Sequence, residues 1–365
     1  IEDTKELRRK EGVYFTPTYV VNHVIELTVR AQLGRILNDA RQLLREYKFT
    51  EARLKIGEVS SIRILDPACG SGSFLIKAFD AIAACYSEYN GAVQEATQQL
   101  LRQRGIEAIG QENFEEVIVV DIGERILLEN LYGVDFDPQA VEVTKLNLWI
   151  KMLSVNPALY RPLIGKRQKK LLPSLKTRVK CGNSLFSPVP FATNLDSETL
   201  AKLIKNRSEQ WRVVLELSPA HSANKTDREI TDLKLHLDSL SREEEKTIVS
   251  IASELEQQAA EEERYFKIED GHCQGLQGLS FVWQLEFPEA FFATEGHPKQ
   301  ESGFDIVLGN PPHGADLTGN ERDIIEESYD LGKGYKNSAF LFIERAHEIL
   351  KPKGQLSLVI PKSLT

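Results

Sequence analysis

The residues most suited to chemistry begin with the segment 62–74, IRILDPACGSGSF. A β-branched run ends on Asp66, and a loop of small residues leads into an apolar stretch at helical spacing, which predicts a strand, a tight loop and a helix. Gly70 and Gly72 can take positive φ and bring the backbone close to a ligand, while the first amides of the helix favour an anionic group. The loop lacks both the third glycine of a dinucleotide fingerprint and the lysine of a P-loop. It therefore predicts a site for the amino-acid end of a zwitterionic cofactor, with Asp66 facing the cationic part.

The run from Asp66 to Phe74 resembles the cofactor loop of S-adenosylmethionine-dependent amino-methyltransferases. It has the form found in N6-adenine-specific DNA methyltransferases of restriction-modification systems (type IIG, Eco57I-like). The resemblance implies S-adenosyl-L-methionine as cofactor and an α/β fold, a Rossmann-like class I methyltransferase sheet with helices on both faces. It also implies cofactor contacts from Asp66, Pro67, Ala68, Cys69, Gly70, Gly72 and Phe74. A purely structural turn in another α/β enzyme is the alternative interpretation.

A second chemical signature, Asn310-Pro311-Pro312-His313, follows the apolar run 304–309, which predicts a buried strand. It resembles the Asn-Pro-Pro-aromatic signature of the same enzymes. The side-chain oxygen of Asn310 and the carbonyl of Pro311 could hold both hydrogens of an adenine amine and turn its lone pair towards the cofactor's methyl group. Positioning of this kind can supply roughly 7–11 kcal/mol of the barrier, so a strong general base is not required. A turn with no active role is the alternative.

His313 departs from the resemblance, because most relatives have tyrosine, phenylalanine or tryptophan after the two prolines. The target base must leave its stack, and a planar side chain offsets part of that cost. An imidazole offers a smaller face, and its protonation at low pH would add repulsion with a protonated amine. We expect this departure to affect the rate of the reaction more than its type.

A second strand-and-helix unit is predicted around Asp135, where an apolar run ends before a helix over 139–152. A carboxylate at a strand tip can accept two hydrogen bonds from a ribose diol, which makes Asp135 the candidate and places Phe136 beside it. Asp137 precedes Pro138 and is predicted to cap the helix, although the two acids could share the ribose role.

Two further segments are assigned to the cofactor by resemblance. Tyr14, Phe15 and Thr16 precede Pro17, and this pattern predicts a helix with threonine as N-cap and proline in the first turn. The family's loop of this type folds over the methionine end of the cofactor. After a predicted short strand at 178–181, Asn183 stands where the family usually has aspartate, and its amide oxygen can still accept a bond from the cofactor's adenine amine. Leu185 and Phe186 could lie against the adenine ring, and a place in the core is the alternative.

Composition sets broad limits. The 365 residues carry a net charge of -9, with 41% hydrophobic and 27% charged residues, which predicts one large α/β domain with an appendage. The charge argues against a uniformly basic nucleic-acid binder but not against a local basic surface. Four scattered cysteines indicate neither a zinc site nor a disulfide framework, and His272, Cys273 and His297 fit no standard metal site. With no apolar run of 18 residues and no signal peptide, we expect a cytoplasmic location and no membrane contact.

The chain is divided by character. We assign 1–55 to an N-terminal helical lead, 56–190 and 281–365 to a methyltransferase core incomplete at its C-terminus, and 191–280 to an inserted helical hairpin standing off the core. The stretch 161–180 has eight lysines or arginines and no acid, so it is either a phosphate contact or a solvated loop. The loop 314–335 could close over substrate. Ile1 in place of a methionine suggests a piece of something longer.

The predicted function is methyl transfer to the N6 amine of a flipped adenine in double-stranded DNA, within a restriction-modification or phage-defence system. A nuclease and a target-recognition domain, fused or as partners, would lie outside this chain. Methylation of a protein glutamine or an RNA adenine, and a catalytically incomplete or scaffold module of a larger restriction enzyme, stay open as alternatives.

Overall fold

A single parallel sheet organises the chain. The computed structural model describes residues 16–104, 114–155, 157, 172–185, 197–222, 225–261, 281–313, 329–330 and 337–360. The strands are β1 (Ile64–Asp66), β2 (Leu131–Asp135), β3 (Val179–Cys181), β4 (Phe304–Gly309) and β5 (Leu350–Leu358), in the order β3-β2-β1-β4-β5. Every neighbouring pair is parallel. The predicted fold class, a Rossmann-like α/β sheet with helices on both faces, is confirmed.

Successive side chains along each strand point to opposite faces of the sheet, so the core has two layers. Ile64 and Ile306 point into one buried cluster, while their neighbours Leu65 and Val307 point into the other. Because both faces of a parallel sheet are covered, these strands are continuously apolar, as the sequence 304–309 already indicated.

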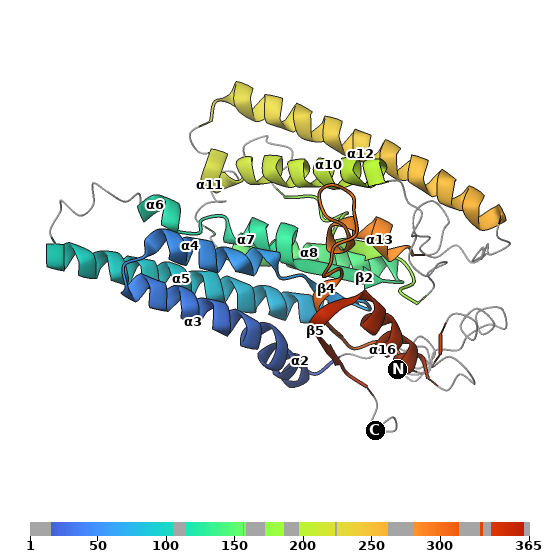
Figure 1. Ribbon diagram of the computed structural model, residues 1–365, viewed down its shortest axis with the longest axis horizontal. Coiled ribbons are helices and arrows are strands. Elements are labelled where there is room, and N and C mark those ends of the chain that lie inside the picture. The colour runs from blue at the N-terminus through green and yellow to red at the C-terminus, as the bar shows by residue number, and fades with distance from the viewer. Residues whose placement is uncertain are drawn as a thin grey trace, which may run out of the picture.

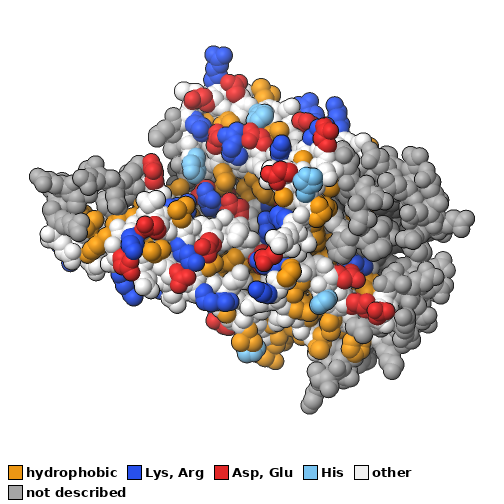
Figure 2. Space-filling view, in the orientation of Figure 1, with side chains coloured by type: hydrophobic (Ala, Val, Ile, Leu, Met, Phe, Trp, Pro, Cys, Tyr) orange, Lys and Arg blue, Asp and Glu red, His pale blue; other side chains and the backbone are white. Residues whose placement is uncertain are grey.

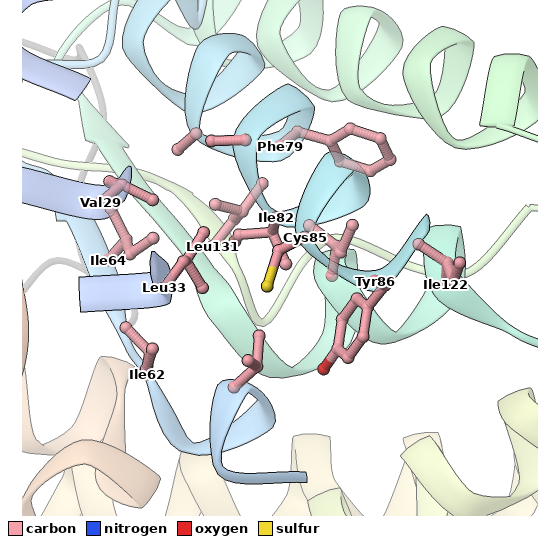
Figure 3. Packing of buried hydrophobic residues seen from close by; sticks show 14 of the residues in the cluster. Val29, Leu33, Ile62, Ile64, Phe79, Ile82, Cys85, Tyr86, Ile122 and Leu131 are labelled. Carbon is pink, nitrogen blue, oxygen red and sulfur yellow. The ribbon is translucent and has the colours of Figure 1, made fainter. Parts of the chain in front are cut away.

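The first layer contains the N-terminal helices and the helices that follow β1 and β2 (Figure 1). Its members are α2 (Thr18–Ile25), the π-helical turn η1 (Glu26–Arg30), α3 (Ala31–Arg45), α4 (Phe49–Gly57), the short η2 (Glu58–Ser61), α5 (Ser73–Arg104), α6 (Phe114–Val117), α7 (Ile122–Arg125), the turn η4 (Ile126–Asn130) and α8 (Pro138–Val155). Figure 3 shows the centre of this layer, where Val29 of η1 lies beside Ile64 of β1 and Ile82 of α5 lies near Leu131 of β2. The N-terminal lead therefore shares its core with the sheet.

The second layer is built from α10 (Ser197–Glu216), α13 (Trp283–Glu286), α14 (Pro288–Phe291) and α16 (Ser338–Ile349). The short α11 (Pro219–Ser222) follows α10, and α12 (Asp227–Glu261) runs beside α10 (Figure 1). We expected the inserted helices to stand off the core, and for α10 this is wrong. Leu200 and Leu203 lie in the same buried cluster as Tyr132 of the sheet.

A buried ion-pair network ties this insertion to the sheet. Arg207 of α10, 1% exposed, pairs with Glu244 of α12 at 2.7 Å and with Glu289 of α14 at 3.1 Å. Glu289 also pairs with Arg178 next to β3 at 2.8 Å. Since each buried charge has an opposite partner, the network fixes α10 and α12 on the second layer.

The surface of the same layer carries charges of both signs. Figure 2 shows lysine and arginine interspersed with aspartate and glutamate over the upper part of the molecule. Exposed pairs such as Arg212 with Glu209 account for part of this pattern. The drawn face is therefore not a uniformly basic surface of the kind that holds a phosphate backbone.

Several boundaries differ from the sequence prediction. The helix expected over 139–152 extends over α8, and the strand expected from Gln355 already begins at Leu350, with a break in register between Phe304 and Ile306. Cys181 is disulfide-bonded, which the scattered cysteines did not indicate. Within the described ranges, no helix has the length and apolarity needed to cross a membrane.

Candidate active site

The two chemical signatures lie side by side at the carboxyl edge of the sheet. β1 and β4 are adjacent and parallel, with Ile64 level with Ile306 and Leu65 level with Val307. The loop after β1 and the Asn310 turn after β4 therefore leave the sheet at neighbouring points. A Cβ on Gly309 would come within 2.5 Å of Asp66 Oδ1, so the two strand ends are in direct contact.

The glycine loop is held in shape by its own backbone and by α8. Gly70 and Gly72 have φ of 52° and 85°, conformations that favour glycine. Thr144 Oγ1 donates to the Gly70 carbonyl at 2.7 Å, and Asn147 Nδ2 donates to the Ser71 carbonyl at 3.0 Å. A side chain on Gly72 would meet Thr144 Cγ2 at 2.9 Å, so only glycine fits here. The loop is thus preformed.

Asp135 joins the second strand tip to this loop. Its Oδ2 accepts from the Gly70 N–H at 2.7 Å and its Oδ1 from the Asp137 N–H at 2.9 Å. Each oxygen keeps a second lone pair with which it can accept a hydrogen bond. Asp137 Oδ1 accepts from the Gln139 N–H at 2.8 Å, which confirms Asp137 as the helix cap. Phe136 beside them is 46% exposed.

Asp66 is a buried carboxyl with a strongly shifted pKa. It is 1% exposed, and its Oδ1 accepts from the Ala68 N–H at 3.1 Å. Burial raises the pKa of Asp66 to about 8, and the nearby Asp135 carboxylate adds to this shift. A cation placed beside Asp66 would reverse it. The position is therefore suited to the positive end of a ligand.

The side-chain amide of Asn310 has a hydrogen-bond partner at its nitrogen and none at its oxygen. Its Nδ2 donates to Thr16 Oγ1 at 2.9 Å, whereas its Oδ1 is buried without a hydrogen-bond partner. The prediction that Thr16 caps the following helix is wrong. Pro17 is the N-cap residue with ψ of 139°, no side chain caps this helix, and Thr18 is its first residue. The threonine hydroxyl is used by Asn310 instead.

The rest of the turn 310–313 is held in place by α16. Pro311 is buried, and the Pro312 carbonyl accepts a hydrogen bond from Ser338 Oγ at the start of that helix. Asn337 caps α16 by accepting from the Ala339 N–H at 3.0 Å. His313 is half-buried, and burial lowers its pKa. The imidazole is therefore neutral at ordinary pH, and the repulsion expected from its protonation applies only under more acidic conditions.

The third strand tip meets the glycine loop through Ser184, whose hydroxyl donates to the Pro67 carbonyl. Asn183 is half-buried, and its Oδ1 accepts from the Leu185 N–H at 3.1 Å. Asn183 Oδ1, which we assigned to the cofactor's adenine amine, therefore already accepts one hydrogen bond within its own turn. One lone pair of this oxygen stays available for the cofactor. Leu185 is 6% exposed and lies in a buried cluster against which Ala68 packs.

The remaining predicted residues are placed as follows. Cys69 is buried, and the Phe74 side chain lies in the core of the first layer, so only its backbone could touch a ligand. Tyr14 and Phe15 lie outside the described residues, as do most of the loop 314–335 and of the basic stretch. Two of the eight cations of that stretch have internal partners: Arg178 pairs with Glu289 and Lys180 with Glu286.

Sequence analysis missed the residues that support the site from outside the motifs. Thr144 and Asn147 lie three apart in α8, among other polar residues of that helix, so their spacing alone did not single them out. Ser338 gave no signal, because its partner is the main-chain carbonyl of Pro312, which is distant in sequence. Arg345 gave none for its contact with the site, a hydrogen bond of 3.2 Å to the Leu185 carbonyl, because that partner is also a distant main-chain group. Among the described residues, no group of three or more metal-ligating side chains occurs.

Comparison with known proteins points the same way as the geometry. The MmeI DNA-methyltransferase domain matches residues 45–193. A Methanocaldococcus jannaschii protein named as a candidate type II restriction enzyme and methyltransferase is 26% identical over 96% of this chain and 32% of its own length. The Escherichia coli type II restriction enzyme and methyltransferase RM.Eco57I is 22% identical over 98% of this chain and 24% of its own length. An adenine-specific methyltransferase, PglX of Lacticaseibacillus casei, is 24% identical over 39% of this chain and 11% of its own length.

The chain thus spans about a third and about a quarter of the two relatives that it matches along nearly its whole length. The Eco57I restriction-modification methylase family matches residues 129–365, which include β2, β3, β4 and the Asn310 turn. With this match over more than half of its length, the chain belongs to the Eco57I restriction-modification methylase family.

Proposed function

We propose that this chain is the catalytic core of an adenine-specific DNA methyltransferase, which transfers the methyl group of S-adenosyl-L-methionine to the N6 amine of adenine in DNA. The observation that carries the proposal is the buried, unpartnered Oδ1 of Asn310, a residue that follows Gly309, whose backbone lies against Asp66. An unsatisfied buried acceptor costs about 1–3 kcal/mol, a penalty that a substrate amine would remove. The adenine specificity named for the PglX relative supports the same substrate.

The residues present fit the cofactor. Asp66 is a buried carboxyl whose Ala68 contact leaves it able to accept from the cofactor's ammonium group. Asp135 keeps lone pairs for a ribose diol, and the Gly70 loop allows close backbone approach. Asn183 and Leu185 stand next to this loop through the Ser184 contact, where an adenine ring would lie. The bound cofactor supplies a methyl group on a positively charged sulfur, a good leaving group.

The reaction then depends on orientation of the amine. Asn310 Oδ1 and the Pro311 carbonyl accept its two hydrogens, so the nitrogen lone pair faces the methyl group rather than the ring. With the cofactor bound, the oriented nitrogen would form its bond to the methyl carbon as the C–S bond breaks, and the methylated amine would then release one proton to water. His313 stacks on the extruded base, and its lowered pKa keeps it uncharged there.

The whole protein would methylate a site in double-stranded DNA as part of a restriction-modification system. The names of the two long relatives combine a restriction enzyme with a methyltransferase. A nuclease and a target-recognition domain are therefore proposed to lie outside this chain. A cytoplasmic location follows from that role, since the DNA is there.

Transfer of tritium from labelled S-adenosylmethionine tests the proposal. Duplex DNA, structured RNA and release-factor protein are incubated in parallel with the full enzyme and with its Asn310→Ala variant. We expect label in duplex DNA alone, recovered as N6-methyladenine, and none with the variant. Label in RNA or in protein glutamine would assign the same turn to another acceptor. Label with the full enzyme but none with this chain alone would show that the core needs the remaining domains.

A further inference from the structure

We propose that Thr16 is a positioning residue for the methyl transfer, an inference that rests on the proposed function. By accepting a hydrogen bond from Asn310 Nδ2, its hydroxyl holds the carboxamide so that Oδ1 faces the substrate amine. The two residues lie 294 positions apart in the chain and meet at 2.9 Å.

A carboxamide needs such a partner, because its two ends are nearly equal in shape and opposite in hydrogen bonding. With Oδ1 towards the amine, Asn310 accepts a hydrogen. With the group rotated by half a turn, Nδ2 would face the amine, and two donors would meet. In the structure Nδ2 is occupied by Thr16 while Oδ1 has no partner, which is the productive orientation. A threonine hydroxyl can donate as well as accept, so it does not choose between the two ends by itself. Its bond fixes the plane of the carboxamide, and in the structure it satisfies Nδ2 and leaves Oδ1 available to the amine.

The position of Thr16 suits this role. The side chain is 8% exposed, and its hydroxyl is not used to cap α2, since Pro17 is the N-cap residue. The helix that follows is fixed in the first layer by Val21, Val24 and Ile25, all less than 9% exposed. A hydroxyl at the end of a packed helix is held in place, so it can restrict the rotation of Asn310.

The test compares three variants of the full enzyme. Thr16→Val keeps the shape and removes the acceptor, and Thr16→Ser keeps the acceptor and removes a methyl group. Thr18→Val makes the same change at an exposed threonine two residues away. Single-turnover methylation of duplex DNA is measured at saturating cofactor, and the dissociation constant of the cofactor is measured by calorimetry. Thermal unfolding shows whether each variant is folded.

We expect Thr16→Val to lower the single-turnover rate by up to about 100-fold, the loss that a misplacement of about 1 Å can cause. The cofactor's dissociation constant should change by less than about threefold, since the substitution is expected to affect the transition state and not the binding of the cofactor in the ground state. Thr16→Ser should recover most of the rate, and Thr18→Val should match the wild type.

Three results would overturn the proposal. A normal rate in Thr16→Val would mean that Asn310 is oriented without the hydroxyl. Weaker cofactor binding with a normal saturated rate would assign Thr16 to the cofactor. Equal loss in the valine and serine variants would mean that the methyl group acts through packing.

A second measurement does not depend on the methyl acceptor. Neutron diffraction from crystals of the wild type and of Thr16→Val distinguishes the deuterated Nδ2 from Oδ1 directly. We expect the wild-type orientation to be lost or mixed in Thr16→Val, and an unchanged orientation would refute the positioning role. If the wild-type enzyme fails to label any DNA, the proposed function fails while this measurement still decides the role of Thr16.

Discussion

The Asp66 carboxyl group lies against the backbone of Gly309, so a Cβ at residue 309 would meet Oδ1 at 2.5 Å and the carboxyl carbon at 3.1 Å. This contact joins the end of β1, which leads to the glycine loop, to the end of β4, which leads to Asn310. The relative position of cofactor and amine thus depends on the absence of a side chain at residue 309.

Gly309→Ala should therefore impair binding and catalysis together. We expect the Asp66 side chain to be displaced, cofactor affinity to fall, and the free energy of unfolding to drop by about 1–3 kcal/mol, as for other overpacked sites. Calorimetry and denaturant unfolding measure the two effects. Gly91→Ala is the control, because a Cβ there meets nothing within 4 Å and lies in the helix α5. That change should stabilise the protein by about 0.5–1 kcal/mol. Unchanged affinity in Gly309→Ala would show that the two strand ends do not act as one unit.

The raised pKa of Asp66 predicts a pH dependence of cofactor binding. With a folded-state pKa of about 8 and a model value of 3.8, the acid contributes stability at low pH that is lost as pH rises towards 8. A cationic ligand lowers the pKa of Asp66, so its binding releases a proton.

We expect affinity for S-adenosylmethionine to rise between pH 6 and pH 8, with proton release detected by calorimetry in buffers of different ionisation enthalpy. Asp66→Asn should abolish that release and weaken binding, while making the cofactor-free enzyme more stable at pH 9. Equal proton release in the variant would assign the linkage to another group.

The hydroxyl of Thr144 is predicted to contribute to cofactor affinity without touching the cofactor. Thr144→Val removes its bond to the Gly70 carbonyl and keeps the volume beside Gly72. Loss of one hydrogen bond, about 1 kcal/mol, should raise the dissociation constant about fivefold. Thr97→Val is the matched control, since its hydroxyl also donates to a main-chain carbonyl, that of Val93, but within α5. If both variants bind the cofactor equally well, the loop keeps its shape without the Thr144 hydroxyl.

The buried ion pairs of Arg207 are predicted to contribute strongly to the free energy of unfolding and to hold α10 and α12 on the sheet. Arg207→Met leaves Glu244 and Glu289 buried with one partner fewer, and we expect a loss of about 3–5 kcal/mol in unfolding free energy. Lys202→Met removes an exposed pair with Glu198 on the same helix and should cost less than about 1 kcal/mol. Proteolysis should cleave α10 and α12 sooner in the first variant only. Equal stability of the two variants would mean that the insertion is held by its apolar face alone.

How far the sequence predicts this structure depends on the range of the interactions. The fold class, strand β4, Asp137 as helix cap and the family could be predicted, because periodicity, caps and motifs are local signals. The hydrogen bond of Thr16 could not, since a threonine before a proline satisfies the capping pattern equally well and its actual partner, Asn310, lies 294 residues away in the chain. The docking of α10 was missed for a similar reason. Its charged sequence conceals Arg207, which is buried only because acids from two other helices surround it.

His313 is predicted to limit the stacking of the extruded base. A benzene ring offers a larger face than an imidazole, and base–aromatic stacking is worth about 1–3 kcal/mol, so His313→Phe should bind target duplex about fivefold more tightly. A duplex with an abasic site at the target position has no ring to stack and should bind both enzymes alike.

Because burial lowers the pKa of His313, the ring is neutral near pH 7, and the pH–rate profile above pH 6.5 should keep its shape in the variant. His297→Phe, which changes an exposed histidine, is the control for the added ring. Tighter binding of the abasic duplex by His313→Phe would show that the new ring contacts the DNA elsewhere and that residue 313 does not stack on the target base.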